Sequence, residues 1–494
     1  MLLSLFKPRA KRVSVTRLGQ WDLDRPLLEW TRGEVWSVRD ALEGALIVGA
    51  TGSGKTSGSG AAMSRAMLEA GFGGLVLTAK ADERALWQRY CAETGRSSDL
   101  LIFGPDHELR FNFLDDERTR GGAGAGLTEN IVALFSIVLE VAERRSGGGG
   151  GREDDGYWRR ALRQLLRNLV DLLIIAGRPI SVPELYRLVV TAPVSLEQAT
   201  SDDWKAESFC FKCLREADAR AKSASQERDF ELVADYFLLE FPGLSEKTRS
   251  VVVSTLTSTI DVLNRGVLRE LFSTSTNVTP DQTADGRIIL LDLPVKEYAE
   301  VGLIAQTIFK YAFQRAIERR DVTASPRPVF LWADEAQHFI TSYDQGFQTT
   351  CRSARVATVL LTQNTPNVYA ALGDGETGKS RADSLFGNLN TKIFHANGDH
   401  VTNEWASQLI GRTRQLFASG NSSHPTSLID WGDAPQSSGG FSEAYEFEVQ
   451  PSVFTRLRTG GPGNGGNVDA IIVRNGRVFP TTGKTWLRTT FRQG

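Results

Sequence analysis

Residues 46–56 read Leu46-Ile47-Val48-Gly49-Ala50-Thr51-Gly52-Ser53-Gly54-Lys55-Thr56. Three apolar residues that predict a buried strand run directly into the pattern G-x-x-x-x-G-K-[ST], a Walker A loop. The glycines let consecutive backbone N–H groups turn toward a polyphosphate, and the helix that follows presents its positive end to the same group. Lys55 is expected to reach the outer phosphates, and Thr56 is expected to hold Mg²⁺. The stretch predicts a site for ATP and Mg²⁺ formed by Gly49, Ala50, Thr51, Gly52, Ser53, Gly54, Lys55, Thr56 and Ser57.

The same pattern occurs a second time at residues 373–380. No buried strand leads into this copy, because residues 367–372 follow Pro366 and make a poor parallel strand. Asp374 and Glu376 would also place two negative charges beside a bound polyanion. We therefore expect an exposed loop here and assign the nucleotide to the first copy.

Short, continuously apolar runs recur along the chain and predict further buried strands at residues 75–77, 288–291, 329–333 and 358–361. Segments with helical periodicity separate several of these runs, which is the pattern of a parallel sheet covered by helices on both faces. Between about residues 152 and 250 the pattern is helical throughout. From Trp158 to Leu173, leucines recur at spacings of three and four residues, as on one face of a helix. The sequence therefore predicts an α/β core with a mainly parallel sheet and a helical insertion.

Two strand ends carry polar residues suited to nucleotide hydrolysis. The run at 329–333 ends in Asp334-Glu335. Because adjacent strand residues point to opposite sides, Asp334 is assigned to the metal and Glu335 to the attacking water. Gln363 lies at the tip of the run 358–362, about one crossover unit after Asp334, and is expected to lie beside the γ-phosphate. Glu335, Gln363 and Lys55 are thus candidate catalytic residues, and Thr56 and Asp334 are candidate metal ligands.

The composition limits the class of protein. The 494 residues include 57 lysines and arginines against 59 aspartates and glutamates, for a net charge of −2. This balance argues against coating nucleic acid with the whole surface and leaves a local basic channel open. Four cysteines are too few for a disulfide framework in a chain of this length, so the cytoplasm is the expected compartment. No apolar run reaches the roughly 18 to 20 residues of a membrane-spanning helix.

Two smaller features receive structural interpretations. Residues 1–20 are expected to form an exposed basic arm, with a weak anchor at an anionic membrane surface as the alternative. Cys210 and Cys213 form a single C-x-x-C without a second pair at zinc spacing, so they are read as two helical cysteines of which one is buried.

Several motifs together resemble the type IV secretion coupling proteins of the TraG/TraD kind, within the FtsK and HerA class of DNA-pumping ATPases. The chain shares with them the order of the Walker A loop, a helical insertion, a long helix opened at Ser245, the acidic pair with Ala336-Gln337, Arg352 and the strand ending at Gln363. Further agreement comes from residues 36–40, 111–115 and 387–388. The resemblance covers about residues 24 to 487.

The resemblance implies a RecA-like P-loop NTPase core, an inserted all-α domain and a hexameric ring that moves single- or double-stranded DNA through its channel without sequence preference. It divides the chain into a first nucleotide-binding part at 1–115, an all-α domain at 116–252 and a second nucleotide-binding part at 253–494. It assigns Arg352 as an arginine finger that reaches the neighbouring subunit's γ-phosphate, with Arg355 as second choice. It also implies a relaxase and the secretion-channel ATPases as partners, at the inner face of the cell membrane.

The sequence departs from that family at two places. Family members usually carry an N-terminal pair of membrane helices that this chain lacks, and the Asp-Pro-Lys-Gly-Glu motif is replaced by Thr78-Ala79-Lys80-Ala81-Asp82-Glu83. Lys80 is expected to line the site or the pore. Two other functions stay open: a soluble HerA-like translocase in DNA processing or phage defence, with a nuclease partner, and a nucleotide-gated recruitment adaptor with little turnover.

Overall fold

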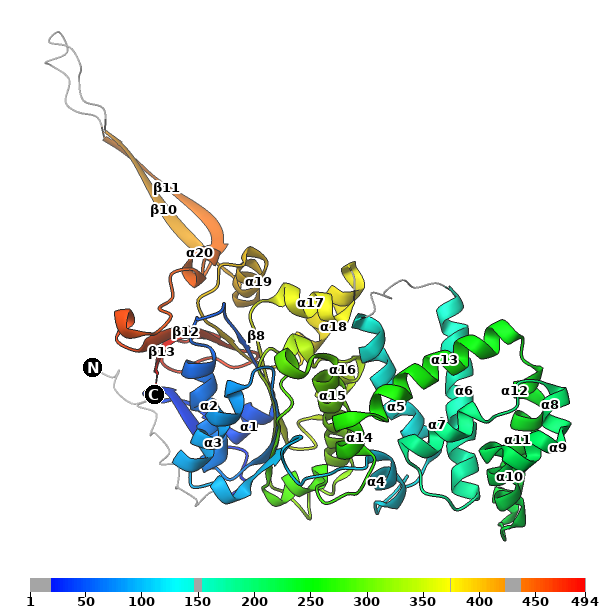
Figure 1. Ribbon diagram of the computed structural model, residues 1–494. Coiled ribbons are helices and arrows are strands. Elements are labelled where there is room, and N and C mark those ends of the chain that lie inside the picture. The colour runs from blue at the N-terminus through cyan, green and yellow to red at the C-terminus, as the bar shows by residue number, and fades with distance from the viewer. Residues whose placement is uncertain (1–18, 146–152, 374, 423–436, 494) are drawn as a thin grey trace, which may run out of the picture.

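A computed structural model describes residues 19–145, 153–373, 375–422 and 437–493 of the chain. The expected basic arm at 1–20 lies outside the described residues except for Gly19 and Gln20. Figure 1 shows a sheet-containing core, a group of helices to one side of it and a long hairpin that projects from the core.

The core is built on one nine-stranded sheet with the order β13-β12-β9-β3-β8-β7-β4-β6-β5. The seven strands from β9 to β5 run parallel, and β12 and β13 are antiparallel to their neighbours. In sheet order the strands are β13 (Trp486–Arg492), β12 (Asn467–Arg474), β9 (Thr391–Phe394), β3 (Ala45–Val48), β8 (Val356–Thr362), β7 (Val329–Ala333), β4 (Gly73–Leu77), β6 (Ile288–Leu291) and β5 (Leu100–Phe103). All five apolar runs of the sequence are strands, and the prediction of a mainly parallel sheet is confirmed.

The strands are apolar along their whole length because both faces of the sheet are covered. Leu46 and Val48 of β3 pack into one core cluster, and Ala45 and Ile47 pack into the other. Each of the leucine, valine and isoleucine side chains contributes about 1.5–3 kcal/mol when fully buried. One face is covered by α1 (Val38–Leu42), α2 (Ala61–Glu69) and α3 (Asp82–Glu93), and the other by α15 (Val295–Arg319), α16 (Ser342–Thr350) and α17 (Thr365–Leu372).

The group of helices beside the core forms a bundle of its own (Figure 1). Its members are α5 (Thr128–Arg145), α6 (Glu153–Ile175), α7 (Val182–Val190), α8 (Leu196–Thr200), α9 (Asp202–Glu207), α10 (Phe209–Ala219), α11 (Ala224–Asp235), α12 (Phe241–Gly243) and α13 (Glu246–Leu263). Five of these helices begin at a serine whose hydroxyl accepts a backbone N–H of the first turn, a cap that contributes about 0.5–2 kcal/mol. The capping residues are Ser181, Ser195, Ser208, Ser223 and Ser245. The helical insertion expected from the periodicity is present, and α5 packs on α15 of the core.

Two sequence predictions are wrong in detail. The second G-x-x-x-x-G-K-S copy is not a loop, because residues from Gly375 onward form α18 (Gly375–Gly387), although Glu376 and Lys379 are exposed as expected. Cys210 and Cys213 are both buried, not one of them. They lie three residues apart on one face of α10, so the burial of that face includes both. The expected boundary of the helical insertion at residue 252 lies within α13 and stays a prediction.

The projecting hairpin consists of β10 (Arg412–Ser422) and β11 (Ser437–Phe447). It follows α19 (His400–Ile410) and leaves Leu416, Phe441 and Tyr445 largely exposed. Among all described residues, no helix combines the length and the apolar content needed to cross a membrane.

A candidate nucleotide site at the ends of four strands

Four neighbouring strands bring the predicted catalytic and metal-binding residues together, apart from Arg352. In the order β3-β8-β7-β4, the strands end at the Walker A loop, Gln363, the Asp334-Glu335 pair and the segment with Lys80. Because parallel strands end at the same edge of the sheet, these segments meet there although they are far apart in the chain.

The Walker A loop requires glycine at two of its positions for reasons of space. A Cβ at Gly49 would lie 2.4 Å from Ser53 Oγ and 2.8 Å from His395 Cβ. A Cβ at Gly54, where φ is +84°, would lie 2.6 Å from a Val468 methyl group of β12. The loop is therefore pressed between the end of β9 and the strand β12, and Lys55 behind it is only 6% exposed.

Residues near the carboxyl end of the chain hold the helix that follows the loop. Gln493 Nε2 donates to Ser57 Oγ at 2.7 Å. His395 Nε2 lies 2.7 Å from Ser59 Oγ, and its Nδ1 lies 3.0 Å from the backbone oxygen of Asp469. Complete burial lowers the pKa of His395 to about 4, so the ring is neutral at pH 7. Since a carbonyl only accepts, Nδ1 carries the proton, and Nε2 accepts the hydroxyl proton of Ser59.

Thr56 and Asp334 form the side of the site suited to a cation. Thr56 Oγ1 donates to Asp334 Oδ2 at 2.8 Å, and the other carboxylate oxygen accepts the backbone N–H of Glu335 at 2.8 Å. Mg²⁺ prefers oxygen ligands and usually binds through one or two protein groups together with substrate phosphates. The hydroxyl and carboxylate present here fit that ion.

Glu335 has an unusual backbone conformation. Its φ of +51° lies in the left-handed region, which is strained for a residue with a Cβ. The carboxylate accepts a hydrogen bond from Nε2 of Gln337 at 2.9 Å. Nε2 of Gln363 donates to both carboxylate oxygens, at 3.1 and 3.2 Å. Lys80 Nζ lies 3.1 Å from its Oε1.

The surroundings of Glu335 keep it ionised. Burial alone would raise its pKa, but the hydrogen bonds from Gln337 and Gln363 and the charges of Lys55 and Lys80 lower the pKa to about 2. A carboxylate in this state accepts hydrogen bonds at physiological pH and can orient a water molecule.

Lys80 and Gln363 are themselves held in place. Burial opposes the charged form of Lys80, yet the hydrogen bond to Glu335 and the charge of Asp334 raise the pKa of this lysine overall. Glu83 accepts the backbone N–H groups of Ala79 and Lys80 and so fixes the segment that carries the lysine. Burial and the charge of Asp334 raise the pKa of Glu83 well above its usual value. The backbone oxygen of Gln363 accepts Nδ2 of Asn397 at 2.9 Å.

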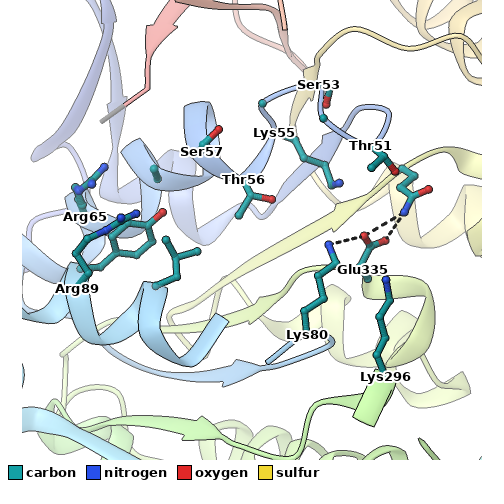
Figure 2. Close-up of a pocket in the computed structure, with 16 residues that line it drawn as sticks. Thr51, Ser53, Lys55, Thr56, Ser57, Arg65, Lys80, Arg89, Lys296 and Glu335 are labelled. Atoms are coloured by element: carbon teal, nitrogen blue, oxygen red, sulfur yellow. Dashed lines mark hydrogen bonds and ion pairs between the residues drawn. The ribbon is translucent and has the colours of Figure 1, made fainter. Parts of the chain in front are cut away.

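These groups surround a cavity of about 280 Å³ (Figure 2). The predicted residues that line it are Thr51, Gly52, Ser53, Gly54, Lys55, Thr56, Ser57, Lys80, Glu335 and Gln363. Gly49 lies behind the loop, and Ala50 lines a separate hollow with Asn397 and Thr455.

The cavity also includes residues that sequence reasoning missed. They are Ala61, Arg65, Leu86, Arg89, Tyr90 and Lys296. Arg65 carried a signal, because it lies one helical turn beyond Ala61 and two beyond Ser57 on the helix that follows the loop. Lys296 carried none, because its position depends on the pairing of β4 with β6.

The structure does not bring Arg352 into this site. Arg352 follows α16, its side chain is 62% exposed, and its Nη1 lies 3.6 Å from Oε1 of Glu43. Glu43 lies two residues before β3, so Arg352 lies at the amino ends of the strands, opposite the Walker A loop. Arg355 has a φ of +54° and donates to the backbone oxygens of Trp21 and Pro326, which indicates a structural role.

Residues 328–450 match a family model described as the TraM recognition site of TraD and TraG. No curated protein matches the chain by sequence. Among solved structures, the fold is similar to the bacterial conjugative coupling protein TrwBdeltaN70 in its unbound monoclinic form, with 14% identity, a TM-score of 0.56 and coverage of 94% of this chain and 88% of that chain. The plasmid coupling protein TrwB in complex with ADP and Mg²⁺ gives 13% identity, a TM-score of 0.57 and coverage of 94% and 89%.

The fold is also similar to VirB4 of Thermoanaerobacter pseudethanolicus, with 12% identity, a TM-score of 0.50 and coverage of 95% and 96%. The resemblance to TraG/TraD coupling proteins is therefore confirmed by the family model for residues 328–450, and the α/β fold with its helical part is confirmed by the solved structures.

Proposed function

We propose that this chain is a coupling ATPase of conjugative type IV secretion, which assembles as a hexamer and uses Mg²⁺-dependent ATP hydrolysis to move DNA. The family match over residues 328–450 and the similarity to TrwB support the coupling role. TrwB has been solved with an ATP analogue and with ADP and Mg²⁺, which supports the same ligands here.

One observation carries the hydrolytic part of the proposal: an ionised Glu335 faces the same cavity as the Walker A loop. The backbone N–H groups of residues 51–56 hold the phosphates, and Lys55 contacts the outer ones. Thr56 and Asp334 would hold Mg²⁺, which when bound would offset the charge of the phosphates. Glu335 orients the attacking water, and Gln363 fixes the carboxylate that does so.

Arg352 is proposed to act on the neighbouring subunit. Its exposure and its place at the sheet edge opposite its own cavity support a role outside its own site. A guanidinium that reaches the next subunit's γ-phosphate offsets charge in the transition state and typically increases kcat by about 10³–10⁵. To do so, Arg352 must break its ion pair with Glu43. The Glu43 carboxylate then still accepts hydrogen bonds from Arg477 and Asn390.

We further propose that residues 116–252 form an all-α domain inserted between the nucleotide-binding parts 1–115 and 253–494. The internal packing of α6, α7, α10, α11 and α13 supports a separate recruiting unit. The family description points to recognition of a partner protein by residues 328–450. This segment includes both strands of the projecting hairpin, β10 and β11. A relaxase and the channel ATPases at the inner face of the cell membrane are the proposed partners.

The test is the rate of ATP hydrolysis by the purified protein, alone and with single- or double-stranded DNA, combined with native mass measurement of its assemblies. We expect DNA to stimulate turnover and nucleotide to favour hexamers. Lys55→Ala is the control, since it removes the lysine that contacts the phosphates. If ATP turnover is slow and unchanged by DNA, and the protein forms no rings, the DNA-moving function is contradicted. That result would favour the nucleotide-gated recruitment adaptor. Rings that work with a nuclease instead of a relaxase would favour DNA processing.

A further inference from the structure

Lys296 lies in the nucleotide cavity although no motif includes it. It belongs to the first turn of α15, at residues 295–298, which we call the Lys296 turn. Its side chain lines the same cavity as the Walker A loop, Glu335 and Gln363. Figure 2 shows Lys80 and Lys296 extending side by side toward Glu335, opposite the segment that carries Lys55.

The sheet order places the two lysines together. Because β4 and β6 are paired, the segments that follow them leave the sheet side by side. The backbone N–H of Val295 donates to the oxygen of Thr78 at 3.4 Å, and that of Lys296 donates to the oxygen of Ala79 at 3.1 Å. The Lys296 turn is therefore fastened to the residues immediately before Lys80.

The two lysines differ in their partners. Lys80 forms an ion pair with Glu335, which also accepts hydrogen bonds from Gln337 and Gln363. Among the residues that the structure describes, no carboxylate forms an ion pair with Lys296. Its charge is therefore available to an anion that enters the cavity. The end of the cavity near Glu335, where the attacking water would be oriented, is the end for the outermost phosphate.

A strained backbone sets the direction of the Lys296 turn. Ala299 has φ +48° and ψ −119°, which interrupts α15 immediately after this turn. Such a conformation is strained for a residue with a Cβ and persists only where its surroundings enforce it. An uninterrupted helix would carry Lys296 in a different direction, since the side chains of successive turns follow the helical repeat.

The helix beyond Ala299 is fixed to the strand ends. A Cβ at Gly302 would lie 2.5 Å from the backbone oxygen of Leu293. Gln306 is fully buried, accepts the backbone N–H of Thr78 and donates to the oxygens of Thr78 and Leu293, each at 2.8 Å. The long part of α15 thus holds the ends of β4 and β6, and the break at Ala299 leaves the Lys296 turn directed at the cavity.

From this geometry we propose that Lys296 contacts the terminal phosphate of the bound nucleoside triphosphate, and that the break at Ala299 positions it there. This assignment rests on the proposed function, because it requires that the cavity binds ATP. It makes Lys296 a residue that distinguishes ATP from ADP, acting from the side opposite Lys55.

The experiment compares the binding of a non-hydrolysable ATP analogue and of ADP, both with Mg²⁺, by titration calorimetry on the full chain. We expect Lys296→Gln to weaken binding of the analogue about tenfold, the effect of losing one charged hydrogen bond, and to change ADP binding by less than about twofold. Lys296→Arg should keep the preference for the analogue. Lys379→Gln is the matched control, because Lys379 is an exposed lysine of the second G-x-x-x-x-G-K-S copy.

Equal weakening of both nucleotides, or no change in either, in Lys296→Gln would overturn the assignment. These results are distinct from failure of the proposed function, in which the wild-type protein itself shows no Mg²⁺-dependent affinity for either nucleotide. Because Lys296 is exposed, the variant is expected to fold, and an unchanged melting temperature checks this.

Discussion

Gln363 donates its side-chain amide to both carboxylate oxygens of Glu335, at 3.1 and 3.2 Å. The residue expected to lie beside the γ-phosphate therefore contacts the residue assigned to the attacking water. In this arrangement a movement of Gln363 changes the orientation and the pKa of that carboxylate together.

We predict that Gln363→Ala moves the acidic limb of the pH–rate profile. In the wild-type protein Glu335 has a pKa of about 2, so its loss of ionisation should not reduce kcat between about pH 8 and pH 4. The variant lacks a hydrogen bond that favours the charged form, so the pKa rises and activity falls at higher pH than in the wild type. Steady-state rates from about pH 4 to pH 8 measure this, because the wild-type profile is flat over this range and a fall of the variant's rate toward pH 4 reports the raised pKa of Glu335. A variant profile as flat as that of the wild type, with only a lower plateau, would show that Gln363 does not control the carboxylate.

Glu335→Gln is expected to bind ATP and fail to hydrolyse it. The amide keeps the size of the side chain but cannot attract a water proton, so we expect kcat to fall at least about a hundredfold while ATP affinity changes little. Single-turnover hydrolysis and calorimetry separate the two quantities. Glu376→Gln, in the exposed part of α18, serves as the control and should turn over at the parental rate. Parental turnover in Glu335→Gln would exclude this residue as the one that orients the water.

Arg352→Ala is expected to lose hydrolysis by about 10³-fold or more and to retain ATP binding, if the arginine acts between subunits. Mixing this variant with Lys55→Ala protein should restore part of the turnover, because an intact arginine then faces an intact cavity across some interfaces. The rate as a function of mixing ratio is the measurement. Arg355→Ala should instead lower the melting temperature, since Arg355 donates to the backbone oxygens of Trp21 and Pro326. Absence of any recovery in mixed rings would count against the cross-subunit role.

His395 should make the protein less stable in mild acid. Its folded pKa of about 4 lies below the usual value of 6.5, so the unfolded chain binds the proton first as the pH falls. Stability is therefore lost progressively from about pH 6.5 down to pH 4, amounting to about 1 kcal/mol from this group at pH 5.5. Melting temperatures at about pH 7.5 and pH 5.5 test this against His395→Gln. The variant should show a smaller drop than the wild type, and an equal drop would assign the acid sensitivity to other groups.

Ala299→Gly is expected to stabilise the protein. Glycine adopts a φ of +48° without a steric penalty, so the substitution should contribute about 1 kcal/mol and raise the melting temperature by about 2 °C. Ala305→Gly, at a buried helical position of α15, is the control and should lower it. A decrease in Ala299→Gly would show that the break is not strained.

Two kinds of site residue could be predicted from the sequence. They belong to one continuous motif, or they directly follow an apolar run that forms a strand. The Walker A loop, Asp334-Glu335 and Gln363 belong to this class, because period and spacing alone place them at strand ends. Lys296 does not, since its place depends on β4 pairing with β6 across about 200 residues of chain. The left-handed φ of Glu335 has no sequence signal either.

The second G-x-x-x-x-G-K-S copy shows why a motif needs its context. Asn364 caps α17 and Pro366 occupies its first turn, so the preceding segment is a helix and not a strand. A Cβ at Gly378 would lie 2.0 Å from the backbone oxygen of Gly373 and 2.5 Å from that of Tyr369. Gly378 thus permits close packing of α18 on α17, which is a different use of the same residue type.

The hydrogen bond from Gln493 to Ser57 joins residues 436 positions apart in the chain. During synthesis on the ribosome, the Walker A loop emerges early and lacks this support until residue 493 has been made. The helical bundle is complete long before that moment. A nascent chain would therefore complete the packing of its helical bundle before the helix that follows the Walker A loop gains the hydrogen bond from Gln493.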